Sequence, residues 1–195
     1  MSDNLKVLHV LPTLKKDGAE VQFANLLMEI KNTEIDIFTF DLYEKGDSIR
    51  PMLKNTNLFY KNSVFYLKKI IDKNKYDIVH SHLPKADLIV GLISVFNKKF
   101  KHIVSVHAKY GTRKEESKIK YLFSNFFWKR ILNNSSGVIA ISKSIYDWLV
   151  EEKHIDHNLI KTIYYGVKIK DREQKVSNQN TIGMAARILP WKGFD

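Results

Sequence analysis

Short apolar runs alternate with amphipathic segments along the chain, and this alternation limits the fold more than any other feature of the sequence. Runs with the length and composition of buried strands lie at 5–11, 35–42, 58–60, 76–82, 102–107, 137–141 and 159–165. Segments with helical spacing of apolar residues follow at 19–30, 64–73, 84–96, 115–132 and 143–152. Strands that alternate with helices build parallel sheets. We therefore predict an α/β fold, with a Rossmann-like parallel sheet and helices on both faces.

The composition narrows the class of protein. The 195 residues suffice for one domain with a sizeable core or slightly more, and they include no cysteine. Disulfides, thiolate metal sites and a cysteine nucleophile are therefore excluded. The apolar run at 7–11 is too short for a signal peptide, and no run approaches the roughly 20 residues that span a bilayer. We expect a cytoplasmic protein, with peripheral attachment to the inner face of the membrane left open.

The net charge of +11 suits an anionic partner, and a surface rich in lysine and asparagine that reflects genome composition is the alternative explanation for part of it. Nucleic acid, an anionic membrane surface and phosphate-bearing ligands all suit a basic chain. The basic residues are scattered and do not form a stripe, and no nucleic-acid motif is present, so we expect no nucleic-acid partner.

The last segment predicts the beginning of a second domain. Residues 168–180 are polar and charged, and we expect them to form a linker after a first domain at 1–167. A short apolar strand within 181–195 has almost nothing to pair with. Arg187 and Lys192 follow that strand, and two cations just past a strand end form a natural clamp for a diphosphate.

The first predicted strand leads into a loop that suits an anion. Ligands of parallel sheets bind beyond the carboxyl ends of the strands. There Lys16, Asp17 and Gly18 precede a helix, and a glycine beside exposed helical N–H groups favours phosphate binding. An ordinary strand-to-helix turn is the alternative explanation for the same residues.

Histidines mark the ends of two later strands. His82 ends the strand at 76–82 and His107 ends the strand at 102–107, so both are expected at the ligand-binding edge. His80 and His82 are two residues apart and share a face of their strand. Two such histidines could bind zinc, but a third ligand is needed and the chain has no cysteine. Histidines that only pack or form hydrogen bonds in the core are the alternative.

Three other histidines are assigned no chemistry. His9 lies in the middle of the first strand and is predicted to be buried structure, whereas His154 and His157 are expected in a solvated loop. The sequence has no Gly-x-Ser-x-Gly elbow, no Gly-x-x-x-x-Gly-Lys-Ser/Thr phosphate loop and no Asp-x-Asp pair. The absence of the last pair argues against a nucleotide-sugar site held by a metal.

Taken in order, these segments resemble the retaining glycosyltransferases of family 4, which have the GT-B fold. The matching segments lie at 12–20, 76–82, 104–107, 136–142, 163–167 and 186–193. The resemblance implies two Rossmann-like domains that face each other across a cleft. This chain would supply the N-terminal half, which binds the acceptor, and the start of the C-terminal domain, which binds a nucleotide-diphosphate sugar.

The resemblance also implies roles at the donor. Arg187 and Lys192 match the family's basic pair on the donor diphosphate, and Gly18 matches the loop that approaches the phosphates or the sugar. Cations at the diphosphate stabilise it as its charge builds during departure. Neither a metal nor another cofactor is therefore expected.

On the acceptor side, His82 matches a histidine beside the transferred sugar and is the candidate catalytic residue. We expect His107, Lys16 and Asp17 to contact the acceptor or to line the cleft. The implied reaction is transfer of a sugar, with retention, to a glycan or lipid-linked acceptor, as in polysaccharide or lipopolysaccharide biosynthesis.

The chain departs from the family in three places. Asp17 stands where a second glycine is usual, and Tyr165 replaces the usual asparagine. The family's two glutamates, eight positions apart, belong to the second domain, and no two glutamates here have that spacing. We therefore expect no efficient transfer by this chain alone, because the reaction depends on holding donor and acceptor together.

A basic, aromatic segment at 113–132 suits an anionic membrane surface. Its cations include Lys118, Lys120, Lys129 and Arg130. The alternative, which we favour for most of the aromatic side chains, is that they pack on the sheet while the lysines are solvated.

Three other functions remain open. A stand-alone module derived from such an enzyme would bind a glycan or a partner chain. A nucleic-acid binder would show a steep salt dependence. An epimerase could share the fold, because a fold does not determine a reaction.

Overall fold

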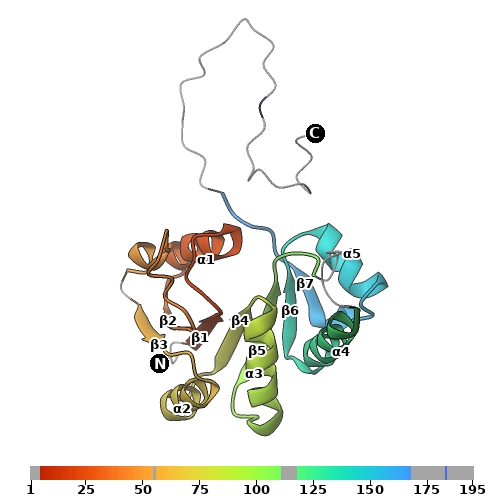
Figure 1. Cartoon of the computed structure of the whole chain (residues 1–195), viewed down its shortest axis with the longest axis horizontal. Helices are drawn as coiled ribbons and strands as arrows, with labels where there is room; N and C mark the ends of the chain where they lie inside the picture. Colours follow the sequence, from red (N-terminus) through yellow and green to blue (C-terminus); the bar gives the residue numbers. More distant parts are fainter. Residues whose placement is uncertain (1–4, 55, 111–117, 168–182, 184–195) are drawn as a thin grey trace, which may run out of the picture.

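The computed structural model describes residues 5–54, 56–110, 118–167 and 183, with side chains after 117 described from residue 126 onward. The described part contains a seven-stranded sheet in which every neighbouring pair is parallel (Figure 1). The strand order is β3-β2-β1-β4-β5-β6-β7. The strands are β1 Leu5–Leu11, β2 Thr33–Thr39, β3 Asn57–Tyr60, β4 Ile78–His82, β5 Lys101–Val106, β6 Gly137–Ala140 and β7 Ile160–Thr162. The predicted α/β fold with a Rossmann-like parallel sheet is confirmed.

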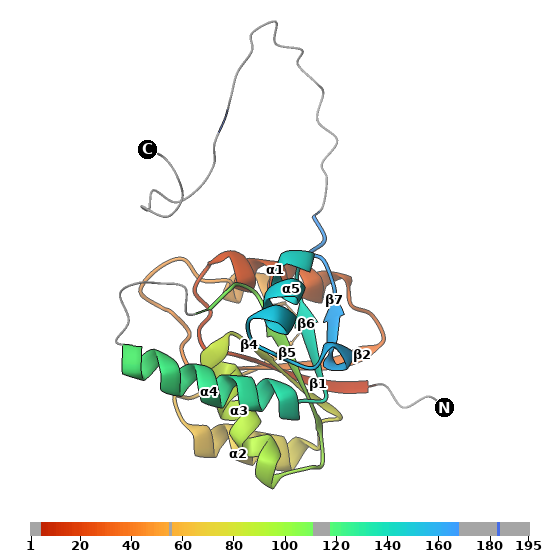
Figure 2. The ribbon, with the colours of Figure 1, turned by 90° about the vertical axis from the view of Figure 1, so that its right-hand side faces the viewer.

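Helices cover both faces of the sheet, as predicted. They are α1 Gly18–Glu29, α2 Val64–Asn74, α3 Pro84–Phe96, α4 Lys118–Asn134 and α5 Lys143–Glu151, with short 3-10 turns at Arg50–Met52 and His157–Leu159. Of the described α-helices, α1 packs on one face and the other four pack on the opposite face; Figure 2 shows α1 across the sheet from α2 and α3. The connections from β1 to β2 and from β2 to β3 run in the opposite direction from the connections after β3. Right-handed connections therefore place α1 on the other face.

The strand order reverses between β1 and β4. From β1 the chain first builds β2 and β3 on one side, and then returns to place β4 on the other side. In open parallel sheets, ligands bind in the crevice beyond such a reversal. The carboxyl ends of β1 and β4 are therefore where the fold itself favours a site.

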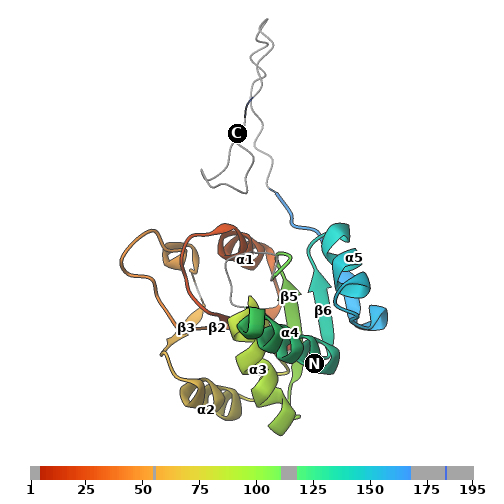
Figure 3. The ribbon, with the colours of Figure 1, turned by 45° about the vertical axis from the view of Figure 1, so that its right-hand side comes forward.

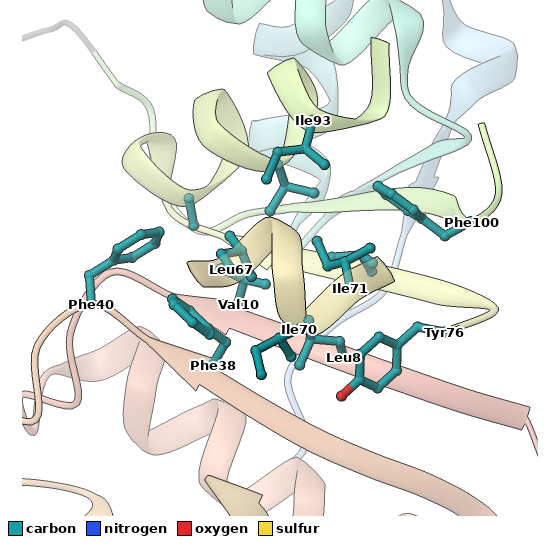
Figure 4. Packing of buried hydrophobic residues seen from close by; sticks show 13 residues of the cluster. Leu8, Val10, Phe38, Phe40, Leu67, Ile70, Ile71, Tyr76, Ile93 and Phe100 are labelled. Carbon is teal, nitrogen blue, oxygen red and sulfur yellow. The ribbon is translucent and has the colours of Figure 1, made fainter. Parts of the chain in front are cut away.

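Hydrophobic side chains from β1, β2, α2 and α3 converge on one cluster between the sheet and the two helices (Figure 4). Leu8, Val10 and Phe38 have no exposed surface. At the edge of this cluster, the hydroxyl of Tyr76 donates a hydrogen bond to Asp36 Oδ2 at 2.6 Å, so the polar end of this buried ring has a partner. Removal of this apolar surface from water provides the main drive for folding and fixes β1 as a central strand.

Two strands end three residues earlier than the sequence predicts. β2 ends at 39 and β7 ends at Thr162, whereas the apolar runs suggest ends at 42 and 165. β7 pairs only with the short strand β6, and the last hydrogen bond joins the N–H of Ile163 to the carbonyl oxygen of Ala140 at 2.9 Å. A strand cannot continue where its partner has ended. Tyr165 therefore lies past the carboxyl end of β7.

The aromatic residues of α4 divide between core and solvent. Trp128 and Ile131 are 4% and 8% exposed, whereas Phe126 and Phe127 are 61% and 48% exposed. The prediction that most of the aromatic side chains pack on the sheet is therefore wrong for the two phenylalanines. With 3.6 residues per turn, they fall outside the stripe that holds Trp128 against the sheet.

Several predicted features lie outside the described residues. They are the linker at 168–180, the second-domain strand within 181–195, Arg187 and Lys192. The domain boundaries therefore stay a prediction. Within the described ranges, no helix is both long enough and apolar enough to cross a bilayer.

The close contact between α3 and α4 yields a prediction about Gly91. The two helices lie side by side (Figures 2 and 3), and a Cβ built on Gly91 would be only 2.4 Å from Cγ2 of Ile131. Such overlap costs roughly 1–3 kcal/mol, more than the gain of about 1 kcal/mol when alanine replaces glycine in a helix. Gly91→Ala is therefore expected to lower the free energy of unfolding in urea titrations.

A second glycine provides the matched control. A Cβ at Gly18 meets no atom within 4 Å, so Gly18→Ala should leave stability unchanged or slightly raised. In an Ile131→Ala background, Gly91→Ala should become neutral or stabilising. If Gly91→Ala were stabilising in the wild-type background, the tight contact would not exist in solution.

Candidate functional site

The loop after β1 is anchored by the segment that follows β2. The buried Leu14 donates its N–H to the carbonyl oxygen of Asp41, and its own carbonyl oxygen accepts from the N–H of Ile49, both at 2.9 Å. Ser48 Oγ donates to the same carbonyl oxygen at 3.0 Å. This anchor determines where the chain turns into α1, at the carboxyl edge of the sheet.

The predicted loop residues lie at the start of α1. Lys16 and Gly18 are exposed, and Asp17 is half-buried. Asp17 occupies the N-cap position without a side-chain hydrogen bond to the first turn, and it forms an ion pair with Lys15 at 3.5 Å. A Cβ at Gly18 would reach no neighbouring atom within 4 Å. The helix therefore starts beside open space, an arrangement that favours an anion.

Three histidines stack on the face of the sheet that α1 covers. Strand register pairs His9 of β1 with His80 of β4, and His82 lies two residues farther along the same face. The ring centroids of His80 and His82 are 4.3 Å apart, and those of His9 and His80 are 4.9 Å apart. Phe23 of α1 covers them, with its centroid 5.0 Å from that of His82. His9 and His82 are each only 3% exposed.

A chain of hydrogen bonds connects this cluster to the edge of the sheet. His9 Nδ1 bonds His82 Nε2 at 3.0 Å, His82 Nδ1 bonds His107 Nε2 at 3.2 Å, and His107 Nδ1 bonds the hydroxyl of Tyr165. Each neutral ring has one N–H and one lone pair. All three histidines must therefore carry the proton on the same ring atom, either Nε2 or Nδ1. The tautomer of the histidine at one end of this series of hydrogen bonds thus sets the tautomer of the histidine at the other end.

Burial keeps these histidines uncharged. It lowers the pKa of His9 to about 3 and that of His107 to about 4, and it holds the pKa of His80 and His82 well below the ordinary value. At neutral pH the rings act as hydrogen-bond partners and lone-pair donors, and they carry no charge for a phosphate.

A strained turn follows His82 directly. Leu83 has φ 72° and ψ 148°, a conformation nearly restricted to glycine, and Pro84 begins α3 at the next residue. Such backbone costs on the order of 1–3 kcal/mol and persists only where the surroundings enforce it. The turn ends β4 abruptly and leaves His82 as its last residue.

A buried carboxyl group on the opposite face holds the end of β4 in place. Ser81 Oγ donates to Asp87 Oδ1 at 2.7 Å, and Trp128 Nε1 donates to Asp87 Oδ2 at 3.1 Å. Burial raises the pKa of Asp87 to about 7, and these two hydrogen bonds partly counteract that rise. Since Ser81 lies between His80 and His82, this network fixes the strand that carries both rings.

The structure brings most of the predicted site residues to one edge. His82 ends β4, as expected, whereas His107 lies one residue past the end of β5, and both lie on the face that carries α1. Gly18 and its loop lie at the same edge, whereas Arg187 and Lys192 are outside the described residues. His154 and His157 are exposed, as predicted.

Three residues of this region received no role from the sequence. His9 was expected to be buried structure, and it is buried, but it also bonds His82. Tyr165 closes the chain of hydrogen bonds at the surface. Glu20, in the first turn of α1, is 3% exposed, and burial raises the pKa of its carboxyl group. Only the pairing of β1 with β4 reveals His9, and the sequence does not state that pairing.

Comparisons with known proteins agree with this architecture. The family model described as Glycosyltransferase Family 4 matches residues 7–171. An uncharacterized glycosyltransferase of Methanocaldococcus jannaschii is 26% identical over 186 residues, which cover 91% of this chain and 51% of that protein. This chain thus spans about half the length of that relative.

Solved structures are similar in fold. The Anabaena protein HepE, in complex with UDP and glucose, has a TM-score of 0.65 at 16% identity, over 84% of this chain and 45% of its own. A UDP-N-acetylglucosamine 2-epimerase has a TM-score of 0.60 at 13% identity, over 80% of this chain and 47% of its own. At such identities the likeness concerns the fold alone, whereas the family model covers most of the sequence. The chain therefore belongs to Glycosyltransferase Family 4.

Proposed function

We propose that this chain forms the acceptor-facing N-terminal half of a glycosyltransferase that uses a nucleotide-diphosphate sugar and retains the anomeric configuration. The observation that carries the proposal is the convergence of His82, His107 and the open turn at Gly18 on one edge, where the strand order reverses. Membership of the family supports the reaction class.

In this proposal the donor phosphates approach the start of α1. The open space at Gly18 would admit them, and the helical N–H groups there favour an anion. Since the histidines are uncharged, cations must come from elsewhere, and Arg187 and Lys192 are the residues we propose for the diphosphate. His82 would lie beside the transferred sugar as a neutral ring, and a hydrogen bond to the sugar would replace one of its bonds to His9 and His107. No metal is required for the transfer step.

The proposal is tested by comparing this chain with a protein that carries both domains. The longer protein should transfer sugar to a glycan or lipid-linked acceptor, and its turnover should survive chelation of divalent metals. The 195-residue chain, shown to be folded, should neither turn over nor bind UDP-, GDP- or ADP-sugars in calorimetric titrations. Micromolar binding by the short chain would contradict the assignment of the donor site to both domains.

A substitution at Gly18 separates donor binding from stability. In the longer protein, Gly18→Val is expected to weaken donor affinity at least about tenfold, because a branched side chain fills the space proposed for phosphate. Its free energy of unfolding should change by no more than about 0.5 kcal/mol. Gly18→Ala should show a smaller loss of affinity. Unchanged donor affinity in both variants would refute the placement of the phosphates.

We also propose that α3 and α4 contact an anionic membrane. Phe96 on α3 is 86% exposed, and Phe126 and Phe127 on α4 are 61% and 48% exposed. Arg130 is exposed and Lys129 half-buried on the same helix. Aromatic and basic side chains together suit the headgroup region of an anionic bilayer.

Charge reversal on α4 tests this contact. Each basic residue near an anionic surface contributes about 1 kcal/mol, so Lys129→Glu with Arg130→Glu should reduce binding to phosphatidylglycerol vesicles at least about tenfold. Leu26→Ser with Met28→Ser on α1 provides the control, because these exposed residues lie on the opposite face. No vesicle binding by the wild-type chain, or equal loss in the control, would contradict the proposal.

A further inference from the structure

Three ring nitrogens converge at the reversal point of the sheet. His9, His80 and His82 each offer one ring nitrogen, and these three atoms lie within 4.8 Å of one another. The third ligand that the sequence lacked beside His80 and His82 is supplied by the neighbouring strand, because β1 and β4 pair His9 with His80.

One pair of these nitrogens already has nearly the spacing of two ligands of one ion. His9 Nδ1 and His82 Nε2 are 3.0 Å apart, and one of them must carry a proton for the hydrogen bond to form. Zinc–nitrogen bonds of about 2.0–2.1 Å allow two ligand nitrogens to approach to little more than this distance. An ion could therefore replace the proton shared by His9 and His82 with only a small movement of these two rings.

The other nitrogens of two rings are held as in known metal sites. His80 Nε2 bonds Ser105 Oγ at 2.8 Å, and His82 Nδ1 bonds His107 Nε2 at 3.2 Å. Histidines that bind metals usually use their second nitrogen for such an outer hydrogen bond, which orients the ring. These contacts leave His80 Nδ1 and His82 Nε2 for an ion.

We infer that His9, His80 and His82 form a binding site for one divalent transition-metal ion of the zinc class. Neutral imidazoles suit zinc, cobalt, nickel and copper, whereas magnesium and calcium prefer oxygen ligands. Three protein ligands leave one tetrahedral position for water. The half-buried His80 lies on the more open side of the cluster.

This site uses none of the residues proposed for the donor diphosphate. An ion bound there would connect β1 to β4 and stabilise the fold by mass action. It would also hold His82 Nε2 in place of the hydrogen bond to His9, so the zinc-loaded form would be the one in which His82 does not reach the sugar. Binding is measured without donor or acceptor, so it succeeds or fails independently of the transfer reaction.

Zinc titration of the 195-residue chain tests the inference directly. We expect one equivalent bound in calorimetry, a higher thermal midpoint, and zinc-dependent changes in the imidazole ¹⁵N resonances of His9, His80 and His82. The exposed His154 and His157 should show none. A folded wild-type chain that binds no zinc, or binds it without changes in the three rings, would overturn the site.

Substitutions then compare how much a ligand and its hydrogen-bond partner each contribute to zinc affinity. Loss of an outer-shell partner alone costs roughly 10–100-fold in metal affinity, so Ser105→Ala should weaken zinc binding by about that factor and His80→Asn by more. His157→Gln is the matched control and should leave zinc affinity unchanged. Unchanged zinc affinity in His80→Asn would overturn the site. If that variant fails to fold, the ¹⁵N resonances of the three wild-type rings decide whether zinc binds there.

Discussion

Replacement of Trp128 by alanine is expected to lower the free energy of unfolding by about 3–5 kcal/mol. Trp128 is 4% exposed and lies edge-on to Tyr110, with ring centroids 5.5 Å apart, and 6.0 Å from the ring of Trp148. Alanine would leave a cavity between α4 and the sheet. It would also remove the N–H that bonds Asp87 and leave a buried carboxyl group with one donor fewer.

A conservative substitution separates these two costs. Trp128→Phe keeps most of the buried ring but removes the donor, so it should cost about 1–3 kcal/mol. Urea titrations of both variants provide the measurement, with equal m-values as the sign of two-state unfolding. If Trp128→Ala and Trp128→Phe lost equal amounts of unfolding free energy, cavity formation would not be the main cause of the destabilisation. A cost below about 1 kcal/mol for alanine would contradict the packing of α4.

The second large effect is a dependence of stability on pH that arises from Asp87. Burial raises its pKa from 3.8 to about 7, so between these values the folded chain keeps a proton that the unfolded chain releases. Stability from this group is therefore highest at low pH and falls as pH rises through the window. The slope is about 1.4 kcal/mol per pH unit, or about 2 kcal/mol between roughly pH 5.5 and pH 7.

Asp87→Asn isolates this effect from other titrating groups. The amide carries no charge, its oxygen can accept from Trp128, and its nitrogen can donate to Ser81 Oγ. The difference in unfolding free energy between wild type and variant should therefore shift in favour of the variant as pH rises. The measurement is a series of urea titrations from about pH 5.5 to pH 8. A difference that is constant across this range would show that Asp87 titrates normally.

The order of strands and helices could be predicted from the sequence, with small errors at the ends. Helical and strand periodicities depend only on the local side-chain pattern, and helix caps are equally local: Ser142 Oγ accepts from the N–H of Ile145 at 3.3 Å. The end of β7 could not be predicted, because a strand ends where its partner ends. The apolar run itself continues to Tyr165.

In the candidate site, too, some features follow from the local sequence and others only from long-range contacts. The sequence by itself determined that His82 and His107 end neighbouring apolar runs and that a glycine precedes the first helix, because these facts depend on local order alone. Only the tertiary structure decided that β1 lies beside β4, which joins His9 to His82 across 73 positions of sequence. Strand order depends on how the crossovers and the core pack, and these are long-range contacts that no local pattern encodes.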